Sequence, residues 1–504
     1  MPYRLAMTPQ RPRRRAAIFA LVASLLALLA LAWAALLAPR RPSGLVLAMV
    51  PVGRYPSVAA IDAGTGRAIV VNRGGPRVAV KVAGGSSFVA PVPGAPDPGS
   101  ISMIDLRSGA LLRTLTIGSG LTMSSILIDE RTHRAFVAGT GGRTGSILVL
   151  DTTTGTLVGT TTLRGDAAVA GIDTASGRVV EASYTAGIVS VLDARSGRVV
   201  WVDAIDQGAS RVLIDERTHR AFVESLPGGY GTRIPGAIAV IDTTSGALLR
   251  RVAVGLSPDG MALAPAEERV YVLNAQGGTV SVLDARSGVV RRTIALTAGG
   301  FPTGSGAIVV DERTHRAFVD HGWTHVFDTR TGRVLHEHRF NTVPGPLAID
   351  RRTDRVFAAT YRNGRIRMLD GASGRLLRTI DVGITPQDMT VDEGSGRIYI
   401  TTPGPVARAV GQVYARGPGR VWVLDARTGA IRARAVVGVD PMTVAVTPQA
   451  RRGVVLNMTD LTPVSDPWGW LPAVLRRAAP LIPPPPPSIQ STNGSVSVLD
   501  LTRS

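Results

Sequence analysis

Apolar and polar residues alternate along most of the chain with a period of two, in short runs separated by Asp, Gly and Thr. Successive side chains of a strand point to opposite faces of a sheet, so this pattern predicts β-strands and excludes helical repeats. Two half-motifs recur. In the first, an apolar run ends in Asp and is followed by a tight turn, Arg and a second apolar run, as at 127–137, 213–223 and 309–319. In the second, an apolar run precedes Asp-x-x-Ser/Thr-Gly, as at 189–197, 280–288 and 421–429.

The aspartates of the second half-motif give the length of the repeat, because most of them are separated by 42 to 49 residues. They are Asp105, Asp151, Asp193, Asp242, Asp284, Asp328, Asp370, Asp425 and Asp500. A period in the low forties with four short strands per unit is typical of propeller blades. We therefore predict an all-β fold, a single β-propeller of four-stranded blades. Nine repeats are counted, and seven or eight blades with a remodelled terminal unit is the alternative.

The ring is predicted to close through an N-terminal strand. The last unit stops after its third strand at 496–504, whereas the apolar run at 45–50 precedes a Val-Gly-x-x-Pro corner that also follows the fourth strand of other units. Residues 45–52 should therefore supply the outer strand of the last blade. The propeller then covers 45–504, with long insertions at 82–100, 226–236, 403–418 and 459–494.

The turns have a recognisable chemistry. In Asp-x-x-Ser/Thr-Gly, the Asp side chain can accept backbone N–H bonds and the Gly can adopt the left-handed conformation. His133, His219 and His315 occupy the Gly position in three turns. A metal site would need these three to converge, but the blades should hold them apart. Because His tolerates positive φ better than most residues, we interpret them as turn residues.

The N-terminal region predicts a membrane anchor. Residues 16–38 form an uninterrupted apolar run, which as a helix would extend roughly 34 Å, enough to cross a hydrocarbon core of about 30 Å. Arginines are concentrated before the run, so the tail 1–15 should remain cytoplasmic and the linker 39–44 should lead outward. We expect a single-pass cell-membrane protein with an extracytoplasmic propeller. The alternative is a cleaved signal peptide ending at Ala32-Trp33-Ala34 and an exported chain.

Composition narrows the chemistry. The chain has no cysteine, which excludes disulfides, thiol nucleophiles and Cys-ligated zinc or iron–sulfur clusters. The formal net charge is +19, but outside the N-terminus no dense Lys/Arg run occurs, so we predict no nucleic-acid partner.

Blade topology predicts two different faces. Turns between strands 1–2 and 3–4 share one face, and every long insertion falls in a strand 2–3 connection on the other. Elaborated loops on a rigid scaffold often bind partners, so we expect a protein or glycan partner there. The candidate binding residues are Arg143, Tyr184, Tyr230, Arg233, His321, Trp323, Tyr361, Arg362 and Tyr414. Trp468 and Trp470, in the last insertion, either contact the membrane interface or pack on the propeller.

The segment 269–288, RVYVLNAQGGTVSVLDARSG, resembles the YVTN-type β-propeller repeat, and 397–402 is a weaker echo. The resemblance implies an extracytoplasmic or surface propeller, in a family mostly without an assigned catalytic role. The segment 192–201 resembles one tryptophan-docking motif of quinoprotein propellers, with Trp201 at the docking position. The other repeats lack this Trp, so we expect no quinone and no other cofactor.

Catalytic groups are sparse. His321, His325, His336 and His338 lie in one repeat with Asp320, and a metal there competes with an ordinary solvated strand. We therefore assign no catalytic residue and no metal ligand. The chain is predicted to be a binding scaffold, and we lean against an enzyme. The alternatives are a lactonase-like hydrolase or lyase, with acids or histidines converging on the channel mouth, and a structural envelope protein.

Overall fold

The computed structural model describes residues 44–74, 77–81, 87–91, 98–117, 122–141, 144–167, 169–205, 208–227, 233–296, 306–339, 344–361, 364–383, 385–409, 412–415, 417–447, 451–458 and 494–503. Residues 44–504 form one compact unit. The predicted cytoplasmic tail and membrane helix lie outside the described residues. Within the described ranges, no helix has the length and apolarity needed to span a bilayer.

Alternating apolar runs become nine antiparallel sheets of four strands, each forming one blade. Blade 1 contains β2 (Pro56–Asp62), β3 (Arg67–Asn72), β6 (Ser100–Asp105) and β7 (Ala110–Thr116). Blade 2 contains β8 (Thr122–Asp129), β9 (Arg134–Gly141), β10 (Thr144–Asp151) and β11 (Leu157–Arg164). Blade 3 contains β12 (Val169–Asp173), β13 (Arg178–Ala182), β14 (Ile188–Asp193) and β15 (Val199–Ala204).

The next three blades repeat this order without a crossover. Blade 4 contains β16 (Ala209–Asp215), β17 (Arg220–Ser225), β18 (Pro235–Asp242) and β19 (Leu248–Leu256). Blade 5 contains β20 (Pro258–Ala264), β21 (Arg269–Asn274), β22 (Thr279–Asp284) and β23 (Val290–Ala295). Blade 6 contains β24 (Ala307–Asp311), β25 (Arg316–Asp320), β26 (Trp323–Asp328) and β27 (Val334–Arg339).

The last three blades complete the set. Blade 7 contains β28 (Pro344–Asp350), β29 (Arg355–Thr360), β30 (Arg365–Asp370) and β31 (Leu376–Asp381). Blade 8 contains β32 (Asp388–Asp392), β33 (Arg397–Thr402), β36 (Pro418–Asp425) and β37 (Ile431–Val439). Blade 9 contains β38 (Pro441–Thr447), β39 (Arg452–Asn457), β40 (Ser495–Asp500) and β1 (Val46–Pro51), and a short 3₁₀ helix η2 (Leu501–Arg503) follows β40.

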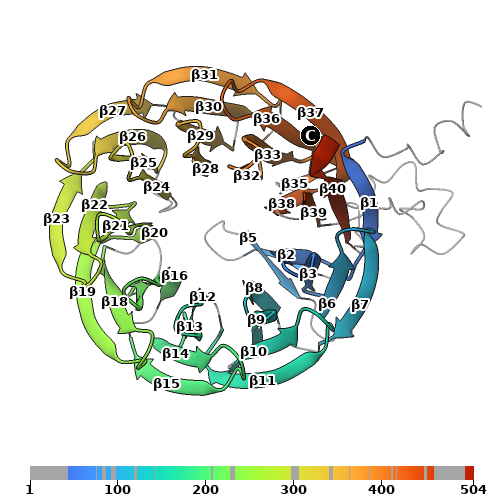
Figure 1. Ribbon diagram of the computed structural model, residues 1–504, viewed down its shortest axis with the longest axis horizontal. Coiled ribbons are helices and arrows are strands. Elements are labelled where there is room, and N and C mark those ends of the chain that lie inside the picture. The colour runs from blue at the N-terminus through green and yellow to red at the C-terminus, as the bar shows by residue number, and fades with distance from the viewer. Residues whose placement is uncertain are drawn as a thin grey trace, which may run out of the picture. The chain divides into compact units, whose positions relative to one another are not determined.

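The blades form a closed ring. The first strands contact one another in succession from β2 to β38, and β38 contacts β2. Figure 1 shows these strands lining the centre, with the fourth strands, such as β11, β15 and β31, on the outside. The predicted count of nine blades is confirmed, and the alternative of seven or eight is wrong.

The predicted closure is also confirmed. β1 pairs antiparallel with β40, with Val50 opposite Val496 and Met49 opposite Ser497. The Val52 N–H donates to the Gly494 carbonyl at 2.9 Å and extends this pairing beyond the strand. The last blade thus takes its outer strand from the beginning of the propeller, which gives it four strands like the other blades.

The core lies between neighbouring blades. The second and third strands are buried on both sides, whereas the fourth strands expose most of their residues, as β15 does. Phe222, Phe318 and Phe357, from the second strands of blades 4, 6 and 7, are fully buried. Burial of one such ring contributes about 2 kcal/mol. Each seam between blades is therefore an apolar layer, and the polar groups lie at its two ends.

The ring has two unlike faces. The turn face carries the turns between strands 1 and 2 and between strands 3 and 4, such as 63–66 and 106–109. The loop face carries the blade-to-blade corners and the strand 2–3 connections. The four long connections between second and third strands are 73–99, 226–234, 403–417 and 458–494. Two of them contain hairpins, β4 (Arg77–Lys81) with β5 (Ser87–Pro91) and β34 (Val406–Ala409) with β35 (Gln412–Ala415).

Candidate binding face

The turn face is built from an Asp-anchored turn between the third and fourth strands, which blades 1 to 8 repeat. In blade 5, the Asp284 carboxylate accepts the Ser287 N–H at 2.7 Å, and Gly288 has φ of 71°. In blade 1, Asp105 accepts the Ser108 N–H at 2.8 Å, and Gly109 has φ of 72°. The predicted turn chemistry is confirmed.

Ion pairs reinforce these turns. In blade 4, Arg220 donates to Asp242 at 2.7 Å and joins the start of the second strand to the end of the third. Burial would raise the pKa of Asp242, but hydrogen bonds from Thr244 and Ser245 and the charge of Arg220 outweigh it and lower the pKa to about 2. The carboxylate is therefore ionised at neutral pH.

The three turn histidines adopt left-handed backbone conformations, with φ of 52° at His133, 55° at His219 and 55° at His315. This confirms their interpretation as turn residues. Each Nδ1 lies 2.9 Å from an acid of the preceding blade: Asp62, Asp173 and Glu267, respectively. The three histidines therefore lie at three different seams.

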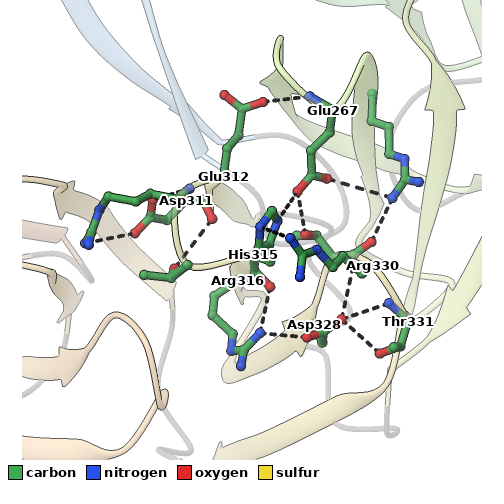
Figure 2. A network of polar contacts seen from close by, with 12 residues as sticks. Glu267, Asp311, Glu312, His315, Arg316, Asp328, Arg330 and Thr331 are labelled. Atoms are coloured by element: carbon green, nitrogen blue, oxygen red, sulfur yellow. Dashed lines mark hydrogen bonds and ion pairs between the residues drawn. The ribbon is translucent and has the colours of Figure 1, made fainter.

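Figure 2 shows the polar network at the seam between blades 5 and 6. Glu267 accepts from the His315 Nδ1–H, and its own backbone N–H donates to Glu312 at 3.0 Å. The Nε2 atom of His315 lies 2.6 Å from an Arg330 guanidinium nitrogen, which donates to it. Neighbouring blades are thus joined by hydrogen bonds in both directions.

Sequence reasoning missed this pairing across the seam, although a signal was present. In each blade with a turn histidine, the residue after the third-strand Asp is Thr: Thr152, Thr243 or Thr329. Each of these hydroxyls donates to the acid that the histidine contacts. The other blades have Ala, Gly or Leu at this position. The coupled presence of His and Thr therefore marks the polar seams.

The predicted binding residues come from several blades of the loop face. Half-buried Tyr184 belongs to blade 3, exposed Arg233 to blade 4 and half-buried Tyr361 to blade 7, and Tyr414 lies in β35 of blade 8. The remaining candidates lie outside the described residues: Arg143, Tyr230, Arg362, Trp468 and Trp470. Of the nine positions, His321 and Trp323 are close neighbours, both after the second strand of blade 6.

Trp323 presents an aromatic surface at the loop face. It begins β26 and is half-buried, and in the β26–β27 register it faces Arg339. The Arg339 guanidinium carbon lies 4.5 Å from the centre of the Trp323 ring, a cation–π arrangement. Glu337 forms an ion pair with the same guanidinium and fixes it over the ring. Aromatic and arginine side chains held in this way are common anchors at interfaces.

His321 is buried and does not lie on the surface of the loop face, and its role in binding stays a prediction. Its exposed fraction is 1%, because the sixth position from the Arg that begins the second strand still packs inside the seam, as Asn274, the last residue of β21, does in blade 5. The His321 ring centre lies 4.9 Å from that of His325, which is also buried. Burial and the neighbouring His325 lower the pKa of His321 to about 4.

Asp320 extends this buried cluster. Burial raises the pKa of Asp320 to about 6, although the Gly322 N–H and the charge of Arg367 from blade 7 act in the opposite direction. The raised pKa of Asp320 and the lowered pKa of His321 both follow mainly from burial, which disfavours the charged form of each side chain. Both side chains are enclosed by the seam. A catalytic group must touch its substrate, so this enclosed cluster favours a structural role in the blade 6–7 seam.

The other histidines of blade 6 belong to the outer strand. The rings of His336 and His338 stack with centres 6.0 Å apart, which confirms that they share one side of the strand. His338 Nε2 donates to the Gly374 carbonyl of blade 7 at 2.9 Å. Over the described ranges, no group of three His, Asp or Glu side chains is placed to hold a metal ion.

Trp201 also has a packing role at a seam. It lies in β15 with 44% of its surface exposed, next to Gly246 of blade 4, where a Cβ would meet the Trp201 side chain. Val149 and Val240 contact Gly197 and Gly288 in the same way at other seams. The resemblance at 192–201 thus corresponds to a contact between blades that other residues also make.

The comparisons place the chain among β-propeller repeat proteins. The sequence profile of a family described as outer membrane protein assembly factor BamB matches residues 234–459. The chain is similar in structure to dihydro-heme d1 dehydrogenase NirN in complex with DHE (13% identity, 79% of this chain and 81% of that chain, TM-score 0.50). It is also similar to a europium-containing methanol dehydrogenase (13% identity, 75% of this chain and 92% of that chain, TM-score 0.50). BamB from Moraxella catarrhalis is similar as well (20% identity, 67% of this chain and 97% of that chain, TM-score 0.46). At these identities the likeness concerns the fold alone, and the YVTN type of repeat stays a prediction. No curated protein matches the chain in sequence.

Proposed function

We propose that the chain is a membrane-anchored, extracytoplasmic β-propeller that binds a protein or glycan partner through its loop face. The observation that carries this proposal is the placement of all four long insertions in strand 2–3 connections, while the opposite face keeps short, nearly identical turns. Loops on a rigid scaffold can change length and sequence without disturbing the core, so they are common binding sites.

Two further findings support a scaffold over an enzyme. The Trp323–Arg339 pair offers an aromatic and cationic anchor at the loop face. The titratable cluster around Asp320 and His321 is enclosed in a seam, where it would not meet a substrate. The match of residues 234–459 to a family described as an assembly factor favours a protein partner over a glycan.

Photo-crosslinking in cells would test the binding face. A photoreactive amino acid at Tyr184 or Tyr361 probes the loop face, and one at Ser287 or Ser373 is a matched control in turns of the opposite face. We expect discrete adducts with another protein from the loop-face positions only. Adducts from the turn face alone, or adducts of the chain with itself from both faces, would contradict the proposal, and the second result would favour a structural envelope protein.

A glycan partner would give no protein adduct in the crosslinking experiment. Binding of the protein to a glycan array is therefore the second test. Trp323→Ala combined with Arg339→Ala should weaken binding of a retained glycan, whereas Ser287→Ala should not. If neither test detects a partner of the loop face, the binding function is wrong.

The proposed location of the protein at the membrane depends on residues 1–44. A signal anchor at 16–38 predicts that the full chain stays with membranes after alkaline extraction, and that its mass includes the N-terminal residues. A mature chain that starts after Ala34 would replace the anchor with export. Trp468→Ala and Trp470→Ala in a chain without residues 16–38 would show whether the last insertion adds membrane affinity.

A further inference from the structure

An arginine begins the second strand of every blade, at the turn face. In six blades it forms an ion pair with the final Asp of the third strand, as Arg178 does with Asp193 at 3.1 Å. In two more blades, Arg67 and Arg269 donate to a backbone carbonyl of the next blade, at 3.1 and 2.9 Å. These eight guanidinium groups therefore have a structural partner.

Arg397, in blade 8, departs from this rule. It lies opposite Asp425 in the strand register, as the rule requires. However, Asp425 accepts instead from Arg432, whose Nη2 lies 2.8 Å away. Among the residues that the structure describes, none accepts a hydrogen bond or an ion pair from the Arg397 side chain.

The guanidinium of Arg397 borders a pocket of about 400 Å³ on the turn face. The pocket is lined by Ser395, Gly396, Arg397, Asp425, Arg432 and Arg503. Arg503 comes from η2 after blade 9 and is 64% exposed, with Asp500 at 3.5 Å. Arg432 is paired with Asp425, and Arg503 lies 3.5 Å from Asp500, so these two carboxylates leave one positive charge, that of Arg397, unbalanced at the pocket. An unbalanced positive charge at a pocket favours a bound anion.

We propose that this pocket binds a small ligand through a tetrahedral oxyanion, a phosphate or sulfate group, with Arg397 as its main hydrogen-bond donor. Two parallel N–H groups of a guanidinium match the oxygens of such an anion. Arg432 and Arg503 line the same pocket. The site lies on the turn face, so it is independent of the partner proposed for the loop face.

Calorimetric titration of the full chain with inorganic phosphate tests the site, with sodium chloride at matched ionic strength as the blank. Arg397→Ala should weaken phosphate binding by about tenfold or more, as expected for loss of a charge-assisted bond. Asp425→Asn should tighten it, because a negative charge is removed while the side-chain oxygen can still accept the Thr428 N–H. A titration with sulfate shows whether the pocket prefers phosphate.

Arg178→Ala is the matched control, because Arg178 occupies the same position in blade 3 but is held by Asp193. Arg178→Ala should lower the free energy of unfolding and leave phosphate binding unchanged. Arg397→Ala should weaken phosphate binding and leave the free energy of unfolding unchanged, because no described acceptor loses its partner. Misfolding should therefore not obscure the result. The proposal is overturned if phosphate gives no more heat than chloride, or if Arg397→Ala and Arg178→Ala bind phosphate equally well.

Discussion

The turn face and the loop face of this ring differ in how much their blades resemble one another. On the turn face, blades 1 to 8 repeat an Asp-anchored turn between their third and fourth strands, and alternate seams from blade 1 to blade 6 add a histidine paired with an acid of the preceding blade. On the loop face, the sixth position counted from the Arg that begins the second strand is Asn274 in blade 5 but His321 in blade 6, and the connections vary from a few residues to a long insertion. Polar contacts cross the seams at both ends. Those at the turn face follow a repeated pattern, whereas those at the loop face, such as Arg211 with Asp259, belong to one seam.

Breaking a polar seam on the turn face should have the largest effect. Asp173 is fully buried and accepts from Thr243, from His219 at 2.9 Å and from the Ser176 N–H at 3.0 Å. Asp173→Ala should cost about 3 kcal/mol, because it leaves the buried Thr243 hydroxyl and two half-buried donors without an acceptor. Equilibrium urea unfolding followed by circular dichroism would measure the loss.

The matched control for this seam is Arg233→Ala on the loop face of blade 4, an exposed position. It should change the free energy of unfolding by less than about 0.5 kcal/mol. Equal losses from the two variants would show that the faces contribute alike, and the comparison would then be wrong.

At the loop-face end of a seam, removal of a buried charge should raise the free energy of unfolding, whereas Asp173→Ala lowers it. Burial raises the pKa of Asp320 to about 6 in the folded protein, above its unfolded value of 3.8. The folded state therefore binds its proton more tightly, and stability falls as pH rises from about 4 to about 6. Asp320→Asn should stabilise the protein by about 3 kcal/mol at pH 7.

The pH profile distinguishes the two faces. The gain from Asp320→Asn should shrink below pH 6 and vanish near pH 4. Asp242 on the turn face has a pKa lowered to about 2, so its contribution is complete above pH 4 and is lost as pH falls further. Urea unfolding of the unchanged protein and of the Asp320→Asn variant at several pH values measures this difference in stability. If the variant were still the more stable protein at pH 4, the charge of Asp320 would not be the cause.

Local sequence was enough to predict the turn face. The two half-motifs, the period and the Val-Gly-x-x-Pro corner led to nine blades and to the β1–β40 closure, because these features are encoded within one repeat. The seam pairs were not predicted, since the acid and the histidine, such as Asp62 and His133, belong to different repeats and meet only when blades pack. The burial of His321 was not predicted either, because its position in the chain suggests a loop, whereas packing encloses the residue.

His219 separates backbone conformation from hydrogen bonding within the turn face. Its φ of 55° is unfavourable for most residues but costs glycine little. Both His219→Gly and His219→Ala lose the bond to Asp173, and only Ala retains the strain. We therefore expect His219→Ala to be less stable than His219→Gly by about 1 kcal/mol in urea unfolding. If Ala were the more stable variant, the left-handed turn would not explain the choice of His.

The smallest effect should come from an ion pair at the rim of the turn face. Arg291 lies 2.7 Å from Asp284 but is 62% exposed, so water and salt screen the pair, and the Asp284 turn keeps its bond from the Ser287 N–H without it. Arg291→Ala should therefore cost about 0.5 kcal/mol or less, and less still in high salt. Arg220 forms the same kind of pair with Asp242 but is only 20% exposed, and it also donates to the His219 carbonyl at 3.1 Å. In parallel urea unfolding, Arg220→Ala should therefore lower the free energy of unfolding clearly more than Arg291→Ala does. The contribution of an ion pair on the turn face to stability depends on its enclosure in the seam, and the number of such pairs matters less.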